Sequence, residues 1–199
     1  MSRNRRYDRE EALDAAMELF WRRGYHATSL KDLEEALNMR PGSIYAAFES
    51  KEALFLAALE RYAQSMGEEF ARELAAAASP LVLLQDHVRK VAPREGGADR
   101  PRACMLVKTL LEATADDESL AVSAGRHLDA VEAQYTRAFS AAAAAGELPK
   151  DADTRRLARR LQANMFGLKT FCHRSEDKAA VRDLAEDIAA EIAALANTG

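Results

Sequence analysis

The sequence has little of what several large classes of protein require. Its two cysteines, Cys104 and Cys172, are too few for the disulfide framework of a small secreted protein. No apolar run is long enough to cross a bilayer, and the opening residues MSRNRRYDREEALDAAM lack the apolar segment of a signal peptide. We therefore expect a cytoplasmic protein with no membrane partner.

Motifs of common catalytic centres are also missing. The sequence contains no G-x-S-x-G, no phosphate-binding glycine loop and no H-E-x-x-H, and its four histidines are scattered. Cys172 and His173 are adjacent, but adjacent residues of a helix point about 100° apart, which argues against a shared metal ion. We expect no enzymatic activity, no cofactor and no metal site.

What is abundant points to an all-α fold. Alanine, leucine, glutamate and arginine dominate the 199 residues, whereas β-branched residues are few. Apolar periodicity and capping residues predict about nine helices. They are expected near residues 8–24, 30–37, 41–48, 51–80, 81–92, 103–114, 119–146, 154–174 and 178–196. The expected division is a head over residues 1–52, with a mobile basic arm carrying Arg3, Arg5 and Arg6, and a helical body over residues 53–199.

The head contains the most informative stretch, RPGSIYAAFESK, at residues 40–51. Pro41 and Gly42 would both weaken a helix interior, but proline is well suited to the first position of a helix. Two short helices with a tight turn before Pro41 form a helix-turn-helix, whose second helix enters the DNA major groove. Gly42 would let the backbone approach a phosphate, and Ser43 and Tyr45 offer hydroxyl groups. Ile44 and Phe48 are expected to face inward.

Residues 8–56 resemble the TetR family of transcriptional repressors. The resemblance is carried by ALDAAMELFWRRGYHATSLKDLEEALNMRPGSIYAAFESKEALF, with its small-residue turn, Gly-Ser-aliphatic-Tyr and Phe-x-x-Lys-Glu-x-Leu in register. It implies a homodimer that binds palindromic double-stranded DNA operators and leaves them when a small-molecule effector occupies the helical body. The DNA-binding residues it implies here are Thr28, Ser29, Arg40, Pro41, Gly42, Ser43, Tyr45, Ala46 and Lys51.

The chain departs from the family pattern at the start and middle of the recognition helix. Arg40 stands where a small N-capping residue is common, and Ala46 and Ala47 stand where bulky polar or aromatic residues are common. Alanine can contact a thymine methyl group but cannot hydrogen-bond a base. Base readout is therefore expected to depend on Arg40 and Ser43. A helical ligand-binding protein without sequence-specific DNA binding is the alternative from another class.

The effector site is expected around the segment ACMLVKTLLEAT, at residues 103–114. This segment is apolar on nearly all sides, which predicts a buried helix beside a cavity. The expected lining or sensing residues are Cys104, Leu106, Val107, Leu111 and Phe166. Similarity to thiol-responding members of the family makes Cys104 a candidate sensor of oxidants or electrophiles, because a helix N-terminus favours the thiolate. The alternative is that Cys104 is a small buried hydrophobic residue.

Two apolar stripes near the C-terminus predict the dimer interface. The stripes lie on the last two expected helices, so one pair from each subunit would form a four-helix bundle. The residues predicted at this interface are Leu157, Leu161, Met165, Leu168, Leu184, Ile188 and Ile192. The same stripes would also suit the core of a single subunit, and the pattern leaves both possibilities open.

Overall fold

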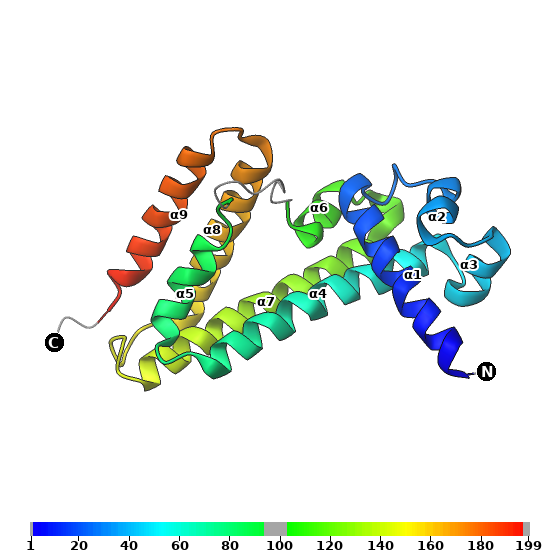
Figure 1. Ribbon diagram of the computed structural model, residues 1–199. Coiled ribbons are helices and arrows are strands. Elements are labelled where there is room, and N and C mark those ends of the chain that lie inside the picture. The colour runs from blue at the N-terminus through cyan, green and yellow to red at the C-terminus, as the bar shows by residue number, and fades with distance from the viewer. Residues whose placement is uncertain (1, 94–102, 197–199) are drawn as a thin grey trace. The chain divides into compact units, whose positions relative to one another are not determined.

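A computed structural model describes residues 2–93 and 103–196, with side chains described from residue 9 onward. Over these ranges the all-α prediction is confirmed: there are nine α-helices, one short 3-10 helix and no strand (Figure 1). The helices are α1 (Ser2–Arg23), α2 (Leu30–Leu37), α3 (Pro41–Phe48), α4 (Lys51–Ala76), α5 (Pro80–Arg89), α6 (Met105–Glu112), η1 (Ala115–Asp117), α7 (Glu118–Ala144), α8 (Thr154–Arg174) and α9 (Lys178–Ala193).

The chain forms two compact units. The first unit comprises Met1–Met66 and Met105–His127, and the second comprises Gly67–Cys104 and Leu128–Gly199. The first unit thus contains the helix-turn-helix together with α6, η1 and the beginning of α7. The division of the chain after residue 52 stays a prediction.

Two helix boundaries differ from the sequence prediction by four or more residues. Helix α1 begins at Ser2, so Arg3, Arg5 and Arg6 belong to a helix and not to an arm. Residues 2–7 contain neither glycine nor proline, and arginine is a good helix former. The helix therefore begins before Asp8, the predicted first residue. Helix α4 ends at Ala76 because Pro80 keeps Ser79 in an extended conformation, from which Ser79 caps α5.

The core of the first unit holds the helix-turn-helix on α1 and α4. Ile44 and Phe48 are buried as predicted, together with Leu19, Phe20, Leu33 and Phe55. The rings of Phe20 and Phe55 pack edge to face, with 4.9 Å between their centroids. Near the surface, the Arg61 guanidinium makes two hydrogen bonds to the Asp14 carboxylate, which ties α4 to α1.

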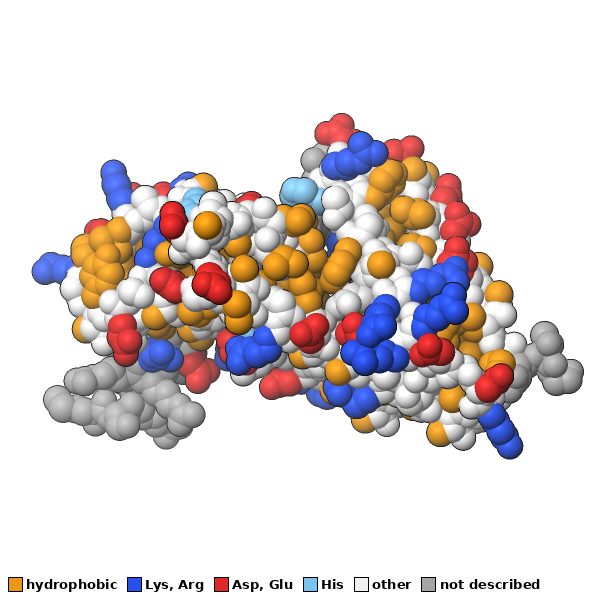
Figure 2. All heavy atoms as spheres, turned by 180° about the vertical axis from the view of Figure 1, so that it is seen from behind, with side chains coloured by type: hydrophobic (Ala, Val, Ile, Leu, Met, Phe, Trp, Pro, Cys, Tyr) orange, Lys and Arg blue, Asp and Glu red, His pale blue; other side chains and the backbone are white. Residues whose placement is uncertain are grey.

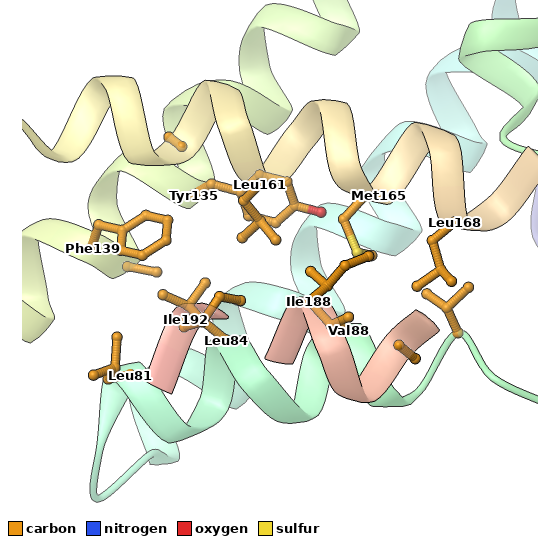
Figure 3. Packing of buried hydrophobic residues seen from close by; sticks show 14 of the residues in the cluster. Leu81, Leu84, Val88, Tyr135, Phe139, Leu161, Met165, Leu168, Ile188 and Ile192 are labelled. Carbon is orange, nitrogen blue, oxygen red and sulfur yellow. The ribbon is translucent and has the colours of Figure 1, made fainter. Parts of the chain in front are cut away.

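The core of the second unit contains most of the residues predicted for the dimer interface. In Figure 3, Leu161, Met165 and Leu168 of α8 point toward α5 and α9. Ile188 and Ile192 of α9 are buried in the same cluster. These five residues serve the core of one chain, and their predicted contact with a second subunit stays a prediction. Helix α5 has an apolar face that must be buried away from water, with Leu81, Leu84 and Val88. The apolar stripes of α8 and α9 bury this face within one chain.

Leu157 and Leu184 differ from the other five predicted interface residues. Both are only partly buried and lie at the edge of the same cluster. Each keeps more apolar surface that a second subunit can cover, and the interface over both stripes stays a prediction. None of the helices in the described part of the chain is long and apolar enough to cross a membrane.

Candidate nucleic-acid interface

The turn between α2 and α3 is set by local sequence. Ser29 caps α2: its hydroxyl accepts from the Asp32 N–H, and the Asp32 carboxylate accepts from the Ser29 N–H in return. The Ser29 hydroxyl also donates to the Asp32 carboxylate over 2.7 Å; this bond, the bond from the Ser29 N–H and the Arg23 guanidinium lower the pKa of Asp32 to about 2. Asn38 ends α2 with a φ of 49°, a left-handed conformation that asparagine tolerates. Pro41 then opens α3.

Helix α3 has one buried and one exposed face. Ile44 and Phe48 fix it to the core, while Arg40, Gly42, Ser43, Tyr45 and Ala46 are exposed, Tyr45 by 45%. The backbone of Gly42 has open space beside it, because a side chain there would meet no atom within 4 Å. The packing of the chain therefore does not require glycine at this position. An external group that must approach the backbone closely would require it.

Thr28 and Ser29 occupy different environments. Thr28 is 0% exposed, and its hydroxyl donates to the Gly24 carbonyl over 2.7 Å. This hydroxyl is satisfied within the chain, and the predicted contact of Thr28 with DNA stays a prediction. Thr28 and Ser29 are adjacent and both carry a hydroxyl group, so the sequence does not indicate which of the two side chains faces inward. Ser29 is exposed at the start of α2 and remains available.

Lys51 is the first residue of α4, directly after Ser50, which caps this helix by accepting from the Ala53 N–H. The Lys51 ammonium lies 4.4 Å from the centroid of the Tyr25 ring, in cation–π contact. Burial lowers the pKa of Lys51, and the nearby Asp117 carboxylate acts in the opposite direction. Tyr25 and Asp117 were not predicted as part of this site.

Charge on the first unit is partly paired. Arg23 forms an ion pair of 2.5 Å with Asp32, and Arg22 lies 3.8 Å from Glu18. On the face of the molecule in Figure 2, basic side chains are interspersed with acidic ones instead of forming one continuous basic field. Of the cations predicted to contact DNA, Arg40 is exposed and Lys51 is half-buried.

The predicted effector residues are spread over both units. Cys104 and Phe166 belong to the second unit. Cys104 is buried and directly precedes α6, and Phe166 of α8 is half-buried. Leu106 is buried and Val107 half-buried, but Leu111 is 80% exposed. The prediction that α6 is buried on nearly all sides is wrong, because Leu110 and Leu111 are exposed; the role of Leu111 in an effector site stays a prediction. An eight-residue apolar stretch gives too few turns to show which side is covered.

Comparison with known proteins identifies the family. The sequence model described as "Bacterial regulatory proteins, tetR family" matches residues 12–58, and that of the "Tetracyclin repressor-like, C-terminal domain" matches residues 87–190. The chain belongs to the TetR family. This membership makes it a DNA-binding transcriptional regulator, confirms the resemblance seen in the sequence, and favours a regulator over a ligand-binding protein without DNA binding.

Relatives of this TetR-family regulator support the assignment over most of its length. It is 31% identical to the HTH-type transcriptional repressor ComR of Escherichia coli K12, over 81% of this chain and 78% of ComR. The fold matches a TetR-family regulator from Cytophaga hutchinsonii with a TM-score of 0.86 at 23% identity, over 100% of this chain and 99% of the other.

A third relative has been solved with DNA. A cysteine mutant of the TetR-family regulator CifR, complexed with 26-base-pair double-strand operator DNA, matches with a TM-score of 0.82 at 29% identity, over 91% of this chain and 94% of the other. Regulators of the family are dimers that bind operator DNA, and this chain is one of them.

Proposed function

We propose that the protein is a cytoplasmic repressor that binds a palindromic operator through α3 and Lys51 and leaves it when a small molecule binds the C-terminal body. The observation that carries the DNA-binding part is the exposed face of α3, where Arg40, Ser43 and Tyr45 surround the open backbone of Gly42. The repressor ComR and the operator complex of CifR support the direction of regulation and the kind of DNA.

Each exposed residue has a role that fits its chemistry. Arg40 and Ser43, at the beginning of α3, carry donors that hydrogen-bond base edges in the major groove. Ala46 presents a methyl group to thymine. Tyr45 and Lys51 contact phosphates and set the position of the helix on the duplex. Two copies of α3 in a dimer would read half-sites about 34 to 36 Å apart, one turn of DNA.

Selection of bound duplexes from a random DNA pool tests the operator hypothesis, and variants test the roles. Lys51→Ala is expected to weaken binding to every duplex by about tenfold and to reduce the slope of log affinity against log salt by about one unit. Arg40→Ala is expected to change which sequences are selected, because it removes a base contact. Lys150→Ala, which removes an exposed lysine of the second unit, is the matched control and should bind like the parent.

If Lys51→Ala and Arg40→Ala both bind the recovered operator like the parent across a salt series, α3 is not the recognition helix. If no sequence is enriched in the selection, the protein does not bind DNA in the way proposed.

The burial of both cysteines supports a small-molecule effector over a thiol switch. Cys104, the candidate sensor, and Cys172 are both buried, so a reagent in solution has little access to either thiol. We therefore expect a thiol-alkylating maleimide or hydrogen peroxide to leave the parent on its operator, as measured by fluorescence anisotropy. Cys172→Ser is the matched control for Cys104→Ser. If either reagent releases the parent and Cys172→Ser but not Cys104→Ser, the alternative holds and Cys104 is the sensor.

A further inference from the structure

We propose that His26 and Asp117 are positioning residues for DNA binding: together they hold the aromatic ring on which Lys51 rests. This inference builds on the proposed phosphate contact of Lys51. All the residues concerned belong to the first unit, although His26 and Asp117 are 91 positions apart in the sequence. The chain of contacts runs from η1, through the turn between α1 and α2, to the start of α4.

Asp117 is the fixed end of this series of contacts. It closes the one-turn helix η1, and its carboxylate accepts from the N–H and the hydroxyl of Thr114, at 2.9 and 2.7 Å. These bonds hold the pKa of the Asp117 carboxyl below its usual value, and the contact with His26 acts in the same direction. A charged carboxylate in a defined orientation is therefore presented to the turn that follows α1.

His26 connects Asp117 to Tyr25: it is hydrogen-bonded to the Asp117 carboxylate and packs against the Tyr25 ring. Its side chain is 52% exposed, so packing alone does not fix the imidazole; the Nε2 atom donates to the Asp117 carboxylate over 2.9 Å. The imidazole and the Tyr25 ring pack edge to face, with centroids 5.2 Å apart. Phe55 of α4 contacts the same ring at 5.1 Å. Tyr25 is thus held between His26 and Phe55.

Lys51 gains from this arrangement in two ways. A lysine side chain has many rotamers, and a contact that restricts them before binding lowers the entropy lost when the ammonium meets a phosphate. The Tyr25 ring face supplies that restriction. The Asp117 carboxylate also favours the charged form of Lys51, against the effect of burial. Glu52, next to Lys51, is turned to α7 instead, where the Ser119 hydroxyl donates to it.

The contact between His26 and Asp117 also joins two parts of the fold, and a purely structural role must be told apart from a positioning role. A structural link would change stability, or would change DNA binding regardless of which residue occupies position 51. A positioning role predicts that the effect of His26 on DNA binding passes through Lys51. A double-mutant cycle between the two positions makes that distinction.

The test uses the full chain and four variants: His26→Ala, His26→Gln, Lys51→Ala and the double variant His26→Ala with Lys51→Ala. Affinity is measured by fluorescence anisotropy on the selected operator and on a non-specific duplex, because a phosphate contact operates on both. His26→Ala is expected to weaken binding about threefold to fivefold, the size of one cation–π contact. His26→Gln, whose side-chain amide can donate to Asp117, should recover most of the loss, and thermal unfolding should confirm that each variant folds.

The decisive comparison is the loss caused by His26→Ala in the Lys51→Ala background, which is expected to disappear. If Lys51→Ala weakens binding but His26→Ala has the same effect with or without Lys51, the positioning role is overturned and the phosphate contact stands. If His26→Ala binds like the parent, the inference is likewise overturned. If Lys51→Ala itself has no effect on either duplex, the proposed function of Lys51 fails, and the inference fails with it.

Discussion

Leu168→Ala is expected to lower the free energy of unfolding by about 2 to 5 kcal/mol, the range seen when a large buried aliphatic side chain is truncated. Leu168 is 1% exposed and points from α8 into the cluster formed with α5 and α9 (Figure 3). Truncation removes apolar contacts and leaves a cavity, because helices on both sides limit how far the core can collapse.

Urea unfolding followed by circular dichroism, at one fixed protomer concentration, measures this loss. Leu157→Ala is the matched control, because Leu157 lies on the same helix and is only partly buried. Its loss of stability should be smaller, and light scattering should show a weaker dimer. If Leu168→Ala unfolds like the parent but scatters as a monomer, Leu168 faces the second subunit and the assignment to the core is wrong.

Much of the fold was predictable because it depends on neighbours in sequence. Ser29 and Ser50 cap helices, Pro41 starts one, and Gly24 ends α1 with a φ of 83°. Each of these signals works within one turn of chain. The recognition helix could be placed for the same reason: its buried face repeats at positions 44 and 48, and the residues between are left outside.

The surface that covers each apolar stripe could not be predicted. Leu168 and Ile192 belong to stripes of a kind that serves equally in a monomer core and a dimer interface. Periodicity shows which face of a helix is apolar, but the covering partner depends on tertiary packing. Here the stripes of α8 and α9 share one core cluster with residues of α5, so they serve the fold of a single chain.

The polar contacts that link distant parts of the sequence could not be predicted either. The hydrogen bond between His26 and Asp117 joins residues with no shared motif, and neither residue belongs to the pattern of the recognition helix. Tyr25, the ring under Lys51, follows Gly24 in a turn where an aromatic residue has no periodic signal. These residues became visible only once the fold had brought them together.

His87 gives the second large expected effect, a loss of stability in mild acid. The imidazole of His87 packs among the rings of Phe70 and Tyr135 in the second unit, and its Nε2 atom shares a hydrogen bond of 3.1 Å with the Tyr135 hydroxyl. Burial lowers the pKa of His87 from 6.5 to about 4, and the charge of Lys169 adds to the effect. Lys90 acts in the same direction and Glu73 opposes it.

The sign of the pH dependence follows from this lowered pKa. Between pH 6.5 and about 4 the unfolded chain binds a proton at His87 that the folded chain does not, so stability falls as the pH falls through this window. From pH 7.5 to pH 5 the expected loss from this one residue is roughly 2 kcal/mol. The Tyr135 hydroxyl stays protonated throughout, because burial raises its pKa.

Urea unfolding at pH 7.5 and pH 5 measures this dependence, and His87→Gln isolates it by replacing the imidazole with an amide that does not titrate. The variant is expected to be less stable than the parent at pH 7.5, because it loses the ring contacts with Phe70 and Tyr135, yet to lose less stability between the two pH values. Burial also lowers the pKa of His127, so His127→Gln serves as the matched variant and accounts for a further part of the slope. An unchanged difference between pH 7.5 and pH 5 in His87→Gln would show that His87 is not excluded from protonation in the folded chain. It would also show that water reaches the cluster between α5 and α7.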